Sequence, residues 1–349
     1  MTVAVADDLK AALQGVAAGV GARAAALDAQ RTDVRTDIAE LGGAGLFDLG
    51  FGDRLDDIVH VIEEVSTLSL AVGFSAWAHR MTLHYLHLAP PQLREAELPR
   101  LRAGTRPGVT AMAAGLKHVA GLAPVPIAAE HDGAGGLRVS GPIRWASNVF
   151  HDALIVLPAS DSTGQSYVVA VDADAEGVIV DPAPNLMALA STASTSLRLD
   201  NVAVPADRII STDLHQFVGR IRPTFLLLQT AFCVGVGRAA IAGAGQRTSG
   251  LGEQFRADLT ELTDRSDRVH ARLYELAADP ARGTTPDFIR LRLEAATLAV
   301  EATRLELALT GGAAYALGTG ANRRFREAAF LPIQSPSEGQ LRWELKQYE

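Results

Sequence analysis

The feature that most limits the fold is a block of strand-like sequence enclosed by two helical blocks. Between about residues 106 and 211, short runs rich in β-branched residues alternate with turns made of Gly, Asp, Asn and Pro. The runs read LRVSGPIRW, DALIVLPA, SYVVAVDA, GVIVDPA and TSLRLDNVAVP. Because no helical segment separates them, they predict one small antiparallel β-barrel or sandwich.

The sequence on both sides of this block has helical spacing. Near the start, Leu9, Leu13, Val16 and Val20 lie three or four residues apart. The last third predicts four or five helices, near residues 220–246, 252–278, 286–317, 321–331 and 337–347. We therefore predict an α+β multi-domain protein: an N-terminal helical domain (1–105), a middle β domain (106–212) and a C-terminal four-helix bundle (213–349).

Charge and cysteine content exclude several classes of protein. The 349 residues carry a net charge of −8, and they lack the basic stripe of a nucleic-acid-binding protein. The single cysteine, Cys233, cannot form an internal disulfide, which suits a reducing compartment. In MTVAVADDLKAAL, Asp7 and Asp8 stand where a signal peptide would carry positive charge. We expect a cytoplasmic protein without a nucleic-acid partner.

One stretch, FLLLQTAFCVGVGRAAIAGAG at 225–245, is long enough to cross a bilayer, for which about 20 apolar residues suffice. It contains Gln229, Thr230 and Arg238, and it has neither an aromatic belt nor a basic flank. A helix that is apolar on nearly all sides is more often the core of a bundle. We therefore predict a buried helix and no membrane span.

No motif for a metal or a nucleotide stands out. His79, His84 and His87 lie in HRMTLHYLH, but only His84 and His87 are spaced to share a helix face, so we predict no metal site. A place in the lining of a pocket and a structural role both remain open for them. The sequence contains no G-x-G-x-x-G after a strand, no P-loop and no G-x-S-x-G.

The segment GPIRWASNVFHDALIVLPA at 141–159, together with the domain order, resembles the acyl-CoA dehydrogenase superfamily of flavoproteins. That family has a Gly, a bulky cation and Trp-Ile-Thr-Asn before an apolar strand, and Gly141, Arg144, Trp145, Ser147 and Asn148 match it. The resemblance implies that Trp145 lies beside the flavin ring and that Ser147 contacts flavin N5. The alternative is a strand-end Trp that only fills the barrel.

Further segments resemble the family more loosely. NVAVP ends at Pro205 as the family's V-x-V-P does, and Gly311 and Gly312 in LTGGAAYALGTGANRRF resemble its G-G-x-G, with Ala314 at the fourth position. These glycines would let backbone approach a dinucleotide or a neighbouring subunit. GVTAMAAGL keeps Thr110 of the family's flavin loop but loses its acid, proline and serine-aspartate, and RTSGLGEQF is the nearest segment to R-x-x-F-G.

By this resemblance, FAD is the expected cofactor, with FMN also possible. The residues implied in binding it are Thr110, Trp145, Ser147, Gly311 and Gly312.

The family's catalytic glutamate has two possible counterparts. Alignment of REA at 326–328 with the family's R-D-A places Ser335 on the base without a gap, whereas a three-residue insertion places Glu338 there. We prefer the gapless register, in which Glu338 is a turn residue. Some relatives carry the base on the first long helix of the bundle, and that region here has Gln229 and no carboxylate.

Three functions follow from the resemblance. The first is a flavin oxidoreductase acting on an acyl thioester or related small substrate, with Glu338 or another group as base. The second is a flavin monooxygenase, which needs no α-proton base and whose T-x-S pattern is similar to Thr192 to Ser194. The third is a non-catalytic subunit that completes a partner's site. We expect a homo-oligomer, a dimer or tetramer built through the C-terminal bundle, with a hetero-oligomer also possible.

Overall fold

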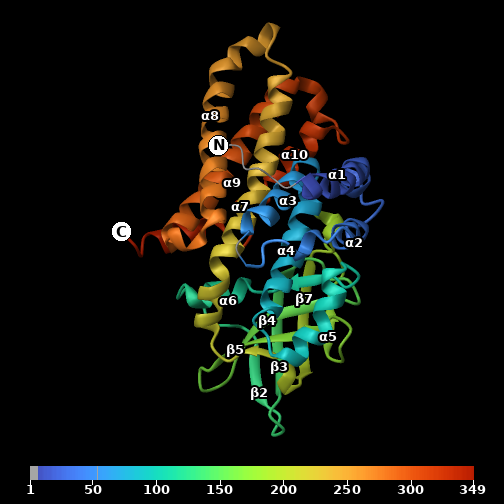
Figure 1. Cartoon of the computed structure of the whole chain (residues 1–349), viewed down its shortest axis with the longest axis vertical. Coiled ribbons are helices and arrows are strands. Elements are labelled where there is room, and N and C mark those ends of the chain that lie inside the picture. Colours follow the sequence, from blue (N-terminus) through green and yellow to red (C-terminus); the bar gives the residue numbers. More distant parts are fainter. Residues whose placement is uncertain (1–6, 53) are drawn as a thin grey trace.

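The computed structural model describes residues 7–52 and 54–349, and it places helices at both ends of the chain around a sheet formed by the middle (Figure 1). The segment MTVAVADDLKAAL, from which we predicted no signal peptide, has its first six residues outside the described part. In Figure 1 the sheet lies below and the long helices of the C-terminal part rise above it. The N-terminal helix at residues 70–86 lies between these two layers and contacts both.

The helices follow the predicted order. The N-terminal helices are α1 (Asp7–Asp28), α2 (Arg35–Gly43), α3 (Leu55–Leu68), α4 (Leu70–Leu86) and α5 (Pro91–Arg102), and α6 (Ala113–Val119) follows the first strand. The C-terminal helices are α7 (Leu214–Gly245), α8 (Arg256–Ala278), α9 (Thr285–Thr310), α10 (Gly320–Ala328) and α11 (Glu338–Leu345).

The strands form one sheet of mixed direction. They are β1 (Gly108–Thr110), β2 (Ala128–His131), β3 (Leu137–Ala146), β4 (Leu154–Ser160), β5 (Ser166–Asp172), β6 (Val178–Val180), β7 (Thr195–Val204) and β8 (Ile209–Ser211). The strand order is β6-β7-β3-β2-β4-β5-β8, with β1 beside β4. The expected wholly antiparallel sheet was wrong in one respect, because β1 and β2 both pair with β4 in parallel.

The strands β4 and β5 are buried on both faces because two separate hydrophobic cores meet there. Leu154 and Val156 point into a helical core that runs through both helical parts of the chain. Ile155 and Leu157 point into a second core enclosed by the sheet. Successive side chains of a strand point to opposite faces, so one apolar strand serves both cores. This explains the continuous apolar run in DALIVLPA.

Helix α7 is interior. By length and composition it could cross a membrane, but 78% of its most apolar window is buried inside the protein. It packs against α3, α4, α8 and α9. The prediction of a buried helix is therefore confirmed, because other helices of the same chain cover it.

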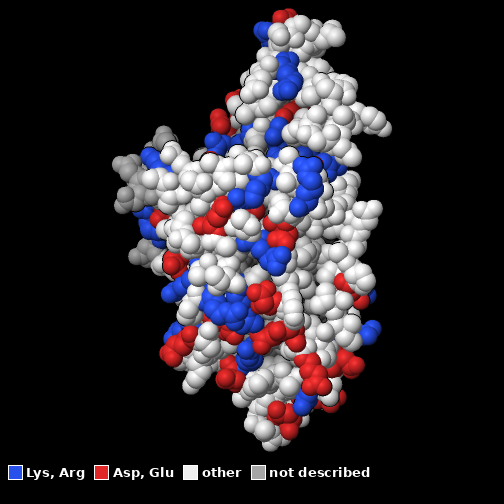
Figure 2. All heavy atoms as spheres, turned by 90° about the vertical axis from the view of Figure 1, so that its right-hand side faces the viewer, with Lys and Arg blue, Asp and Glu red and all other residues white. Residues whose placement is uncertain are grey.

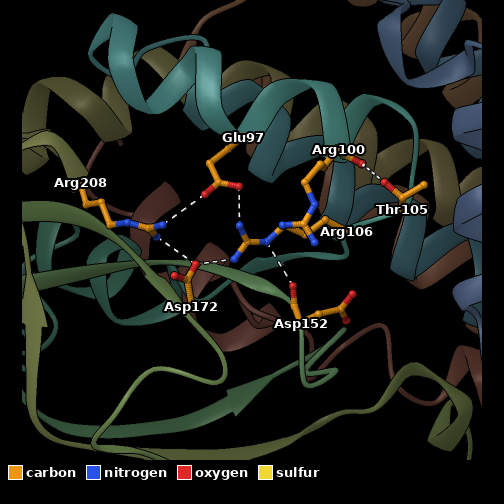
Figure 3. A network of polar contacts seen from close by, with 7 residues as sticks. All are labelled: Glu97, Arg100, Thr105, Arg106, Asp152, Asp172 and Arg208. Atoms are coloured by element: carbon orange, nitrogen blue, oxygen red, sulfur yellow. Dashed lines mark hydrogen bonds and ion pairs between the residues drawn. The ribbon is translucent and has the colours of Figure 1, made fainter.

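A ring of alternating charges fastens the sheet to the N-terminal helices (Figure 3). Arg106, just before β1, contacts both Glu97 of α5 and Asp172 at the end of β5. Arg208, after β7, contacts the same two carboxylates at 3.2 Å and 2.9 Å. Because Glu97 and Arg106 are buried, each charge needs its partners. The ring fixes the position of β1, which carries Thr110.

The third C-terminal helix ends earlier than predicted. It ends at Thr310 instead of residue 317, because Gly311 adopts a φ of +67°, which lies outside the helical region.

Beyond the end of α9, Tyr315 and Leu317 are 94% and 79% exposed. The expected homo-oligomer stays a prediction, and these side chains mark where an interface would be sought. Figure 2 shows acidic and basic side chains interspersed over the face seen from the right of Figure 1.

Candidate functional site

The residue after β3, Ser147, begins a chain of hydrogen-bonded hydroxyl groups. Pairing of β3 with β7, which joins Ala146 to Thr195, brings the two strand ends together. The Ser147 Oγ lies 2.6 Å from the Ser194 Oγ, which lies 2.7 Å from the Thr192 Oγ1. The Thr192 hydroxyl donates to the Leu189 carbonyl at 2.7 Å. This last bond orients the chain, because each hydroxyl has one proton to donate. Ser147 therefore donates to Ser194 and keeps its lone pairs free to accept.

The backbone around this chain is strained. Asn148, Leu189 and Ala193 have φ values of +63°, +63° and +46°. Non-glycine residues rarely adopt such angles, and each instance costs on the order of 1–3 kcal/mol. Such strain persists only where the surroundings enforce it, and here Asn148 is held firmly. Its side-chain nitrogen donates to the carbonyls of Ser75 on α4 and Gly108 on β1 at 2.9 Å and 3.1 Å.

Several buried polar atoms near this turn lack a hydrogen-bond partner in the described part of the chain. They are the Asn148 Oδ1, the Ser75 Oγ and the Ser191 Oγ. Buried polar atoms normally have partners, so a group of them marks a place where a polar ligand or water is bound. At the same strand end, Trp145 is 60% exposed, which leaves an aromatic surface open beside Ser147. The filled-barrel alternative for Trp145 was therefore wrong.

Thr110 lies on the same side of the sheet. Its strand β1 also contains Gly108, whose carbonyl accepts from Asn148, so β1 and the end of β3 are adjacent. The Thr110 Oγ1 is 2.8 Å from the Tyr85 hydroxyl, and Tyr85 is fully buried on α4. The structure thus brings Thr110 and Ser147 to one edge of the sheet.

Gly311 and Gly312 are in a different region. They directly follow α9, which packs against α7, α8, α10 and α11, whereas Thr110 and Ser147 lie at strand ends. Both are exposed, and a side chain added at either would meet no atom within 4 Å. Packing within this subunit does not require glycine at 312, and at 311 the positive φ requires it. Within one subunit, these glycines are not brought to the residues at the end of β3.

The loop that holds Ser335 is bracketed by two glutamine side chains. The Gln229 and Gln334 amide nitrogens both donate to the Ser335 carbonyl, at 2.9 Å and 2.8 Å. Their oxygens accept from the buried guanidinium of Arg292 at 3.2 Å and 3.0 Å. Since Arg292 can only donate, both amide orientations are fixed. The two positions considered for a base, Ser335 and Gln229, therefore meet, and both are neutral.

Aromatic rings fill the space beside Gln229 and the Ser335 loop. Phe74 and Trp77 of α4 are stacked with centroids 5.4 Å apart. Phe225 and Phe232 lie on the Gln229 side of α7, four residues before and three after it. Trp77 contacts Phe225 edge-on at 5.0 Å, and Phe330 contacts Phe74 at 4.9 Å. Close-packed aromatic side chains thus separate α4 from α7 next to the candidate base positions.

Glu338 lies at the first turn of α11, with an exposed side chain. Its Oε1 is 2.7 Å from Arg342 one turn later, and its amide donates to the Pro332 carbonyl at 2.8 Å. The side chain of Glu338 is 37% exposed. Its carboxylate therefore pairs along the helix surface, a contact that contributes only about 0.3–0.5 kcal/mol.

We expect Glu338→Gln to leave flavin reduction or turnover within about twofold of wild type, because a solvated surface group usually changes stability by no more than about 0.5 kcal/mol. Turnover can be measured with any substrate that reduces the bound flavin. Arg342→Gln removes the other half of the same pair and is the matched control. A loss of about 2–4 orders of magnitude with Glu338→Gln alone would identify it as a general base.

Sequence reasoning missed Arg292 and did not anticipate the orientation of the hydroxyl chain. Arg292 is 1% exposed, and it has no ion-pair partner in the part of the chain that the structure describes. The signal in the sequence was an arginine within the apolar stretch FIRLRLEAA. Two arginines occur in that stretch, and spacing did not tell which one is buried.

The fold was compared with known proteins. No protein-family model and no curated protein matches the sequence. Butyryl-CoA dehydrogenase from Megasphaera elsdenii has a TM-score of 0.87 at 16% identity, over 100% of this chain and 99% of that one. A glutaryl-CoA dehydrogenase from Mycobacterium smegmatis in complex with FADH2 gives 0.85 at 15% identity, over 99% and 95%.

PigA, solved with FAD and proline, gives a TM-score of 0.86 at 13% identity, over 100% of this chain and 99% of that one. At such low identities the likeness concerns the fold, and it extends over the whole chain. The resemblance seen in the WASN segment and in the domain order is confirmed at this level. This chain therefore has the fold of the acyl-CoA dehydrogenases and of the flavoproteins built like them.

Proposed function

We propose that this protein is an FAD-dependent oxidoreductase whose flavin ring lies against the end of β3. The observation that carries the proposal is the oriented hydroxyl chain from Ser147 through Ser194 to Thr192, next to the exposed Trp145. Strained backbone and unpartnered polar atoms gather at the same place. Proteins of this fold solved with FAD or FADH2 support the choice of FAD.

The residues present fit such a cofactor. Trp145 would cover the ring, Ser147 would contact it at N5, and Thr110 would approach from β1. Gly311 and Gly312 would serve the adenylate half of a cofactor shared with a neighbouring subunit, since both are exposed at the end of α9 with open space around them. Bound flavin would supply a two-electron acceptor. Because the Ser147 proton is donated to Ser194, this serine offers an acceptor, which suits an N–H group on the ring.

The reaction class follows from the two candidate base positions, Ser335 and Gln229, which both carry neutral side chains. Desaturation of an acyl thioester needs a carboxylate that removes the α-proton. Ser335 and Gln229 cannot do this, and α7 contains neither Asp nor Glu. Within the proposed function, flavin-dependent monooxygenation is therefore favoured over acyl thioester dehydrogenation.

The test of the function is a titration of the purified protein with FAD and, in parallel, with FMN. We expect quenching of flavin fluorescence that saturates at one FAD per chain. Anaerobic addition of butyryl-CoA should leave the flavin absorbance unchanged, because neither Ser335 nor Gln229 can remove the α-proton. Protein that neither contains nor quenches either flavin would overturn the proposal, and bleaching by butyryl-CoA would favour the dehydrogenase instead.

Ser147→Ala is expected to lower the reduction potential of the bound flavin by roughly 20–30 mV, the equivalent of one hydrogen bond of about 1 kcal/mol. The reason is the loss of an acceptor that stabilises the reduced ring. The potential can be measured by equilibration with a reference dye. Ser160→Ala is a matched control, because Ser160 and Ser166 form a similar hydroxyl pair at 2.7 Å elsewhere in the sheet. An unchanged potential would place Ser147 away from the ring.

A further inference from the structure

A buried arginine on α4 has no ion-pair partner among the residues that the structure describes. Arg80 is 0% exposed, and its Nε and Nη2 donate to the Leu49 carbonyl at 3.3 Å and 3.0 Å. Its Nη1 has no hydrogen-bond partner among the described residues. Asp48, the acid whose charge acts on Arg80, is paired with Arg102 at 3.0 Å. Burial lowers the pKa of Arg80 to about 9, so the residue is still a cation at neutral pH.

Two histidines present further unpartnered nitrogens on the same face of α4. His84 and His87 follow Arg80 by four and seven residues, which places all three on one side of the helix. The His84 Nδ1 and the His87 Nε2 are buried, and neither has a partner within residues 7–52 and 54–349. Burial and neighbouring arginines lower their pKa values to about 3 and 4. Both rings are therefore neutral at pH 7, and each can place an N–H on the unpartnered nitrogen.

His79, on the same helix, is a structural histidine, because both of its ring nitrogens form hydrogen bonds. Its Nε2 donates to the Leu101 carbonyl at 2.8 Å, and its Nδ1 accepts from the Gly108 amide at 2.9 Å. Both of its nitrogens are satisfied, and it lies on another face of α4. The unpartnered nitrogens of His84 and His87 are thus not a general property of this helix.

The ring of Phe51 covers the three side chains. Its centroid lies 3.5 Å from the Arg80 Cζ, 3.8 Å from the His87 ring centroid and 6.2 Å from that of His84. Phe51 is flanked by Gly50 and Gly52, which have φ values of +74° and +100°. Gly52 also borders a hollow of about 330 Å³ beside the start of α3. The ring therefore sits on a short segment between two glycines of positive φ.

We propose that Arg80, His84 and His87 form a binding site for a small oxyanion, a carboxylate or a phosphate group, and that Phe51 covers it when the ligand is absent. One guanidinium and two imidazole N–H groups match the charge and the acceptors of such an anion. A bound anion would supply the counter-charge that the buried Arg80 lacks. Arg94, Arg102 and Arg220 add to the positive field at the two histidines. The site is separate from the one at β3 and does not depend on flavin.

The proposal can be tested by calorimetric titration of the full chain with sodium phosphate and with sodium acetate, at constant ionic strength. We expect binding of one anion per chain. Phe51→Ala should tighten it at least threefold, because the covering ring no longer competes for Arg80. Arg80→Met should weaken it at least tenfold. Stronger binding of phosphate or of acetate identifies which oxyanion the site takes, and either result supports the proposal.

Arg138→Met is the control for a general charge effect, since Arg138 is exposed on β3 and is not among the groups whose charge acts on Arg80, His84 or His87. It should change binding by less than twofold. If Arg80→Met does not fold, Phe51→Ala and His87→Phe decide, the second by an expected loss of at least threefold. The proposal is overturned if neither anion binds wild type and Phe51→Ala. It is also overturned if binding is equal in wild type and both of these variants, which would indicate an adventitious ion only.

Discussion

Phe232→Ala is expected to lower the free energy of unfolding by about 3–5 kcal/mol, the usual cost of removing a buried aromatic ring. Phe232 is 0% exposed on α7. Its ring lies 5.9 Å from that of Trp77 and 6.1 Å from that of Phe74, both edge-on, and the Arg292 Cζ is 5.7 Å away. The truncation opens a cavity that these neighbours cannot close. Urea unfolding followed by circular dichroism measures the loss as a lower midpoint at an unchanged slope.

Phe325→Ala is the matched control for this prediction. Phe325 lies on α10 and is 37% exposed, so its truncation should cost much less than that of Phe232. If the two variants lost equal stability, the aromatic cluster between α4 and α7 would not be close-packed. In that case the space beside Gln229 would be open to a ligand, and the aromatic side chains would not exclude a substrate from it.

Glu327→Gln is expected to remove a fall in stability between about pH 4.5 and pH 7. Glu327 is 3% exposed on α10, and burial raises the pKa of its carboxyl from 4.5 to about 7. Between these values the folded protein keeps a proton that the unfolded chain has released. The unfolding free energy therefore decreases as pH rises through this range, by about 3 kcal/mol in total. Glutamine does not titrate, so the variant should be the more stable protein above pH 7 and nearly equal to wild type near pH 4.5.

The groups that face Glu327 set the size of this effect. Arg323 on the same helix lies 3.8 Å away, and the Leu70 amide at the start of α4 donates to the carboxylate, and both favour the ionised form. Asp28 of α1 opposes ionisation, and Arg324 favours it weakly. Burial outweighs them all. Urea unfolding at several pH values measures the difference, and Glu253→Gln, an exposed carboxylate on another segment, is the control. A variant that keeps the wild-type slope would show that another group titrates in this range.

The sequence by itself determined the order of elements. Helical spacing and β-branched runs are local signals, because the period of a helix or strand is set by its own backbone. The strands at 137–146, 154–160, 166–172 and 195–204 therefore lie where the alternating runs predicted them. The WASN segment also predicted correctly that Trp145 and Ser147 lie side by side, since both belong to one strand end. The helix end at Gly311 was readable in principle, because a glycine after a helical run is a common stop.

Only the tertiary structure decided what these residues can do. Gln229 and Ser335 are 106 residues apart, and their contact exists because α7 and the loop before α11 pack around Arg292. The proton order from Ser147 to Thr192 depends on one carbonyl, that of Leu189, in a segment far from β3. Burial, hydrogen-bond partners and the charge state of a buried group arise from segments distant in sequence. No local pattern records them, so the sequence indicated the fold and the candidate residues, whereas packing decided their chemistry.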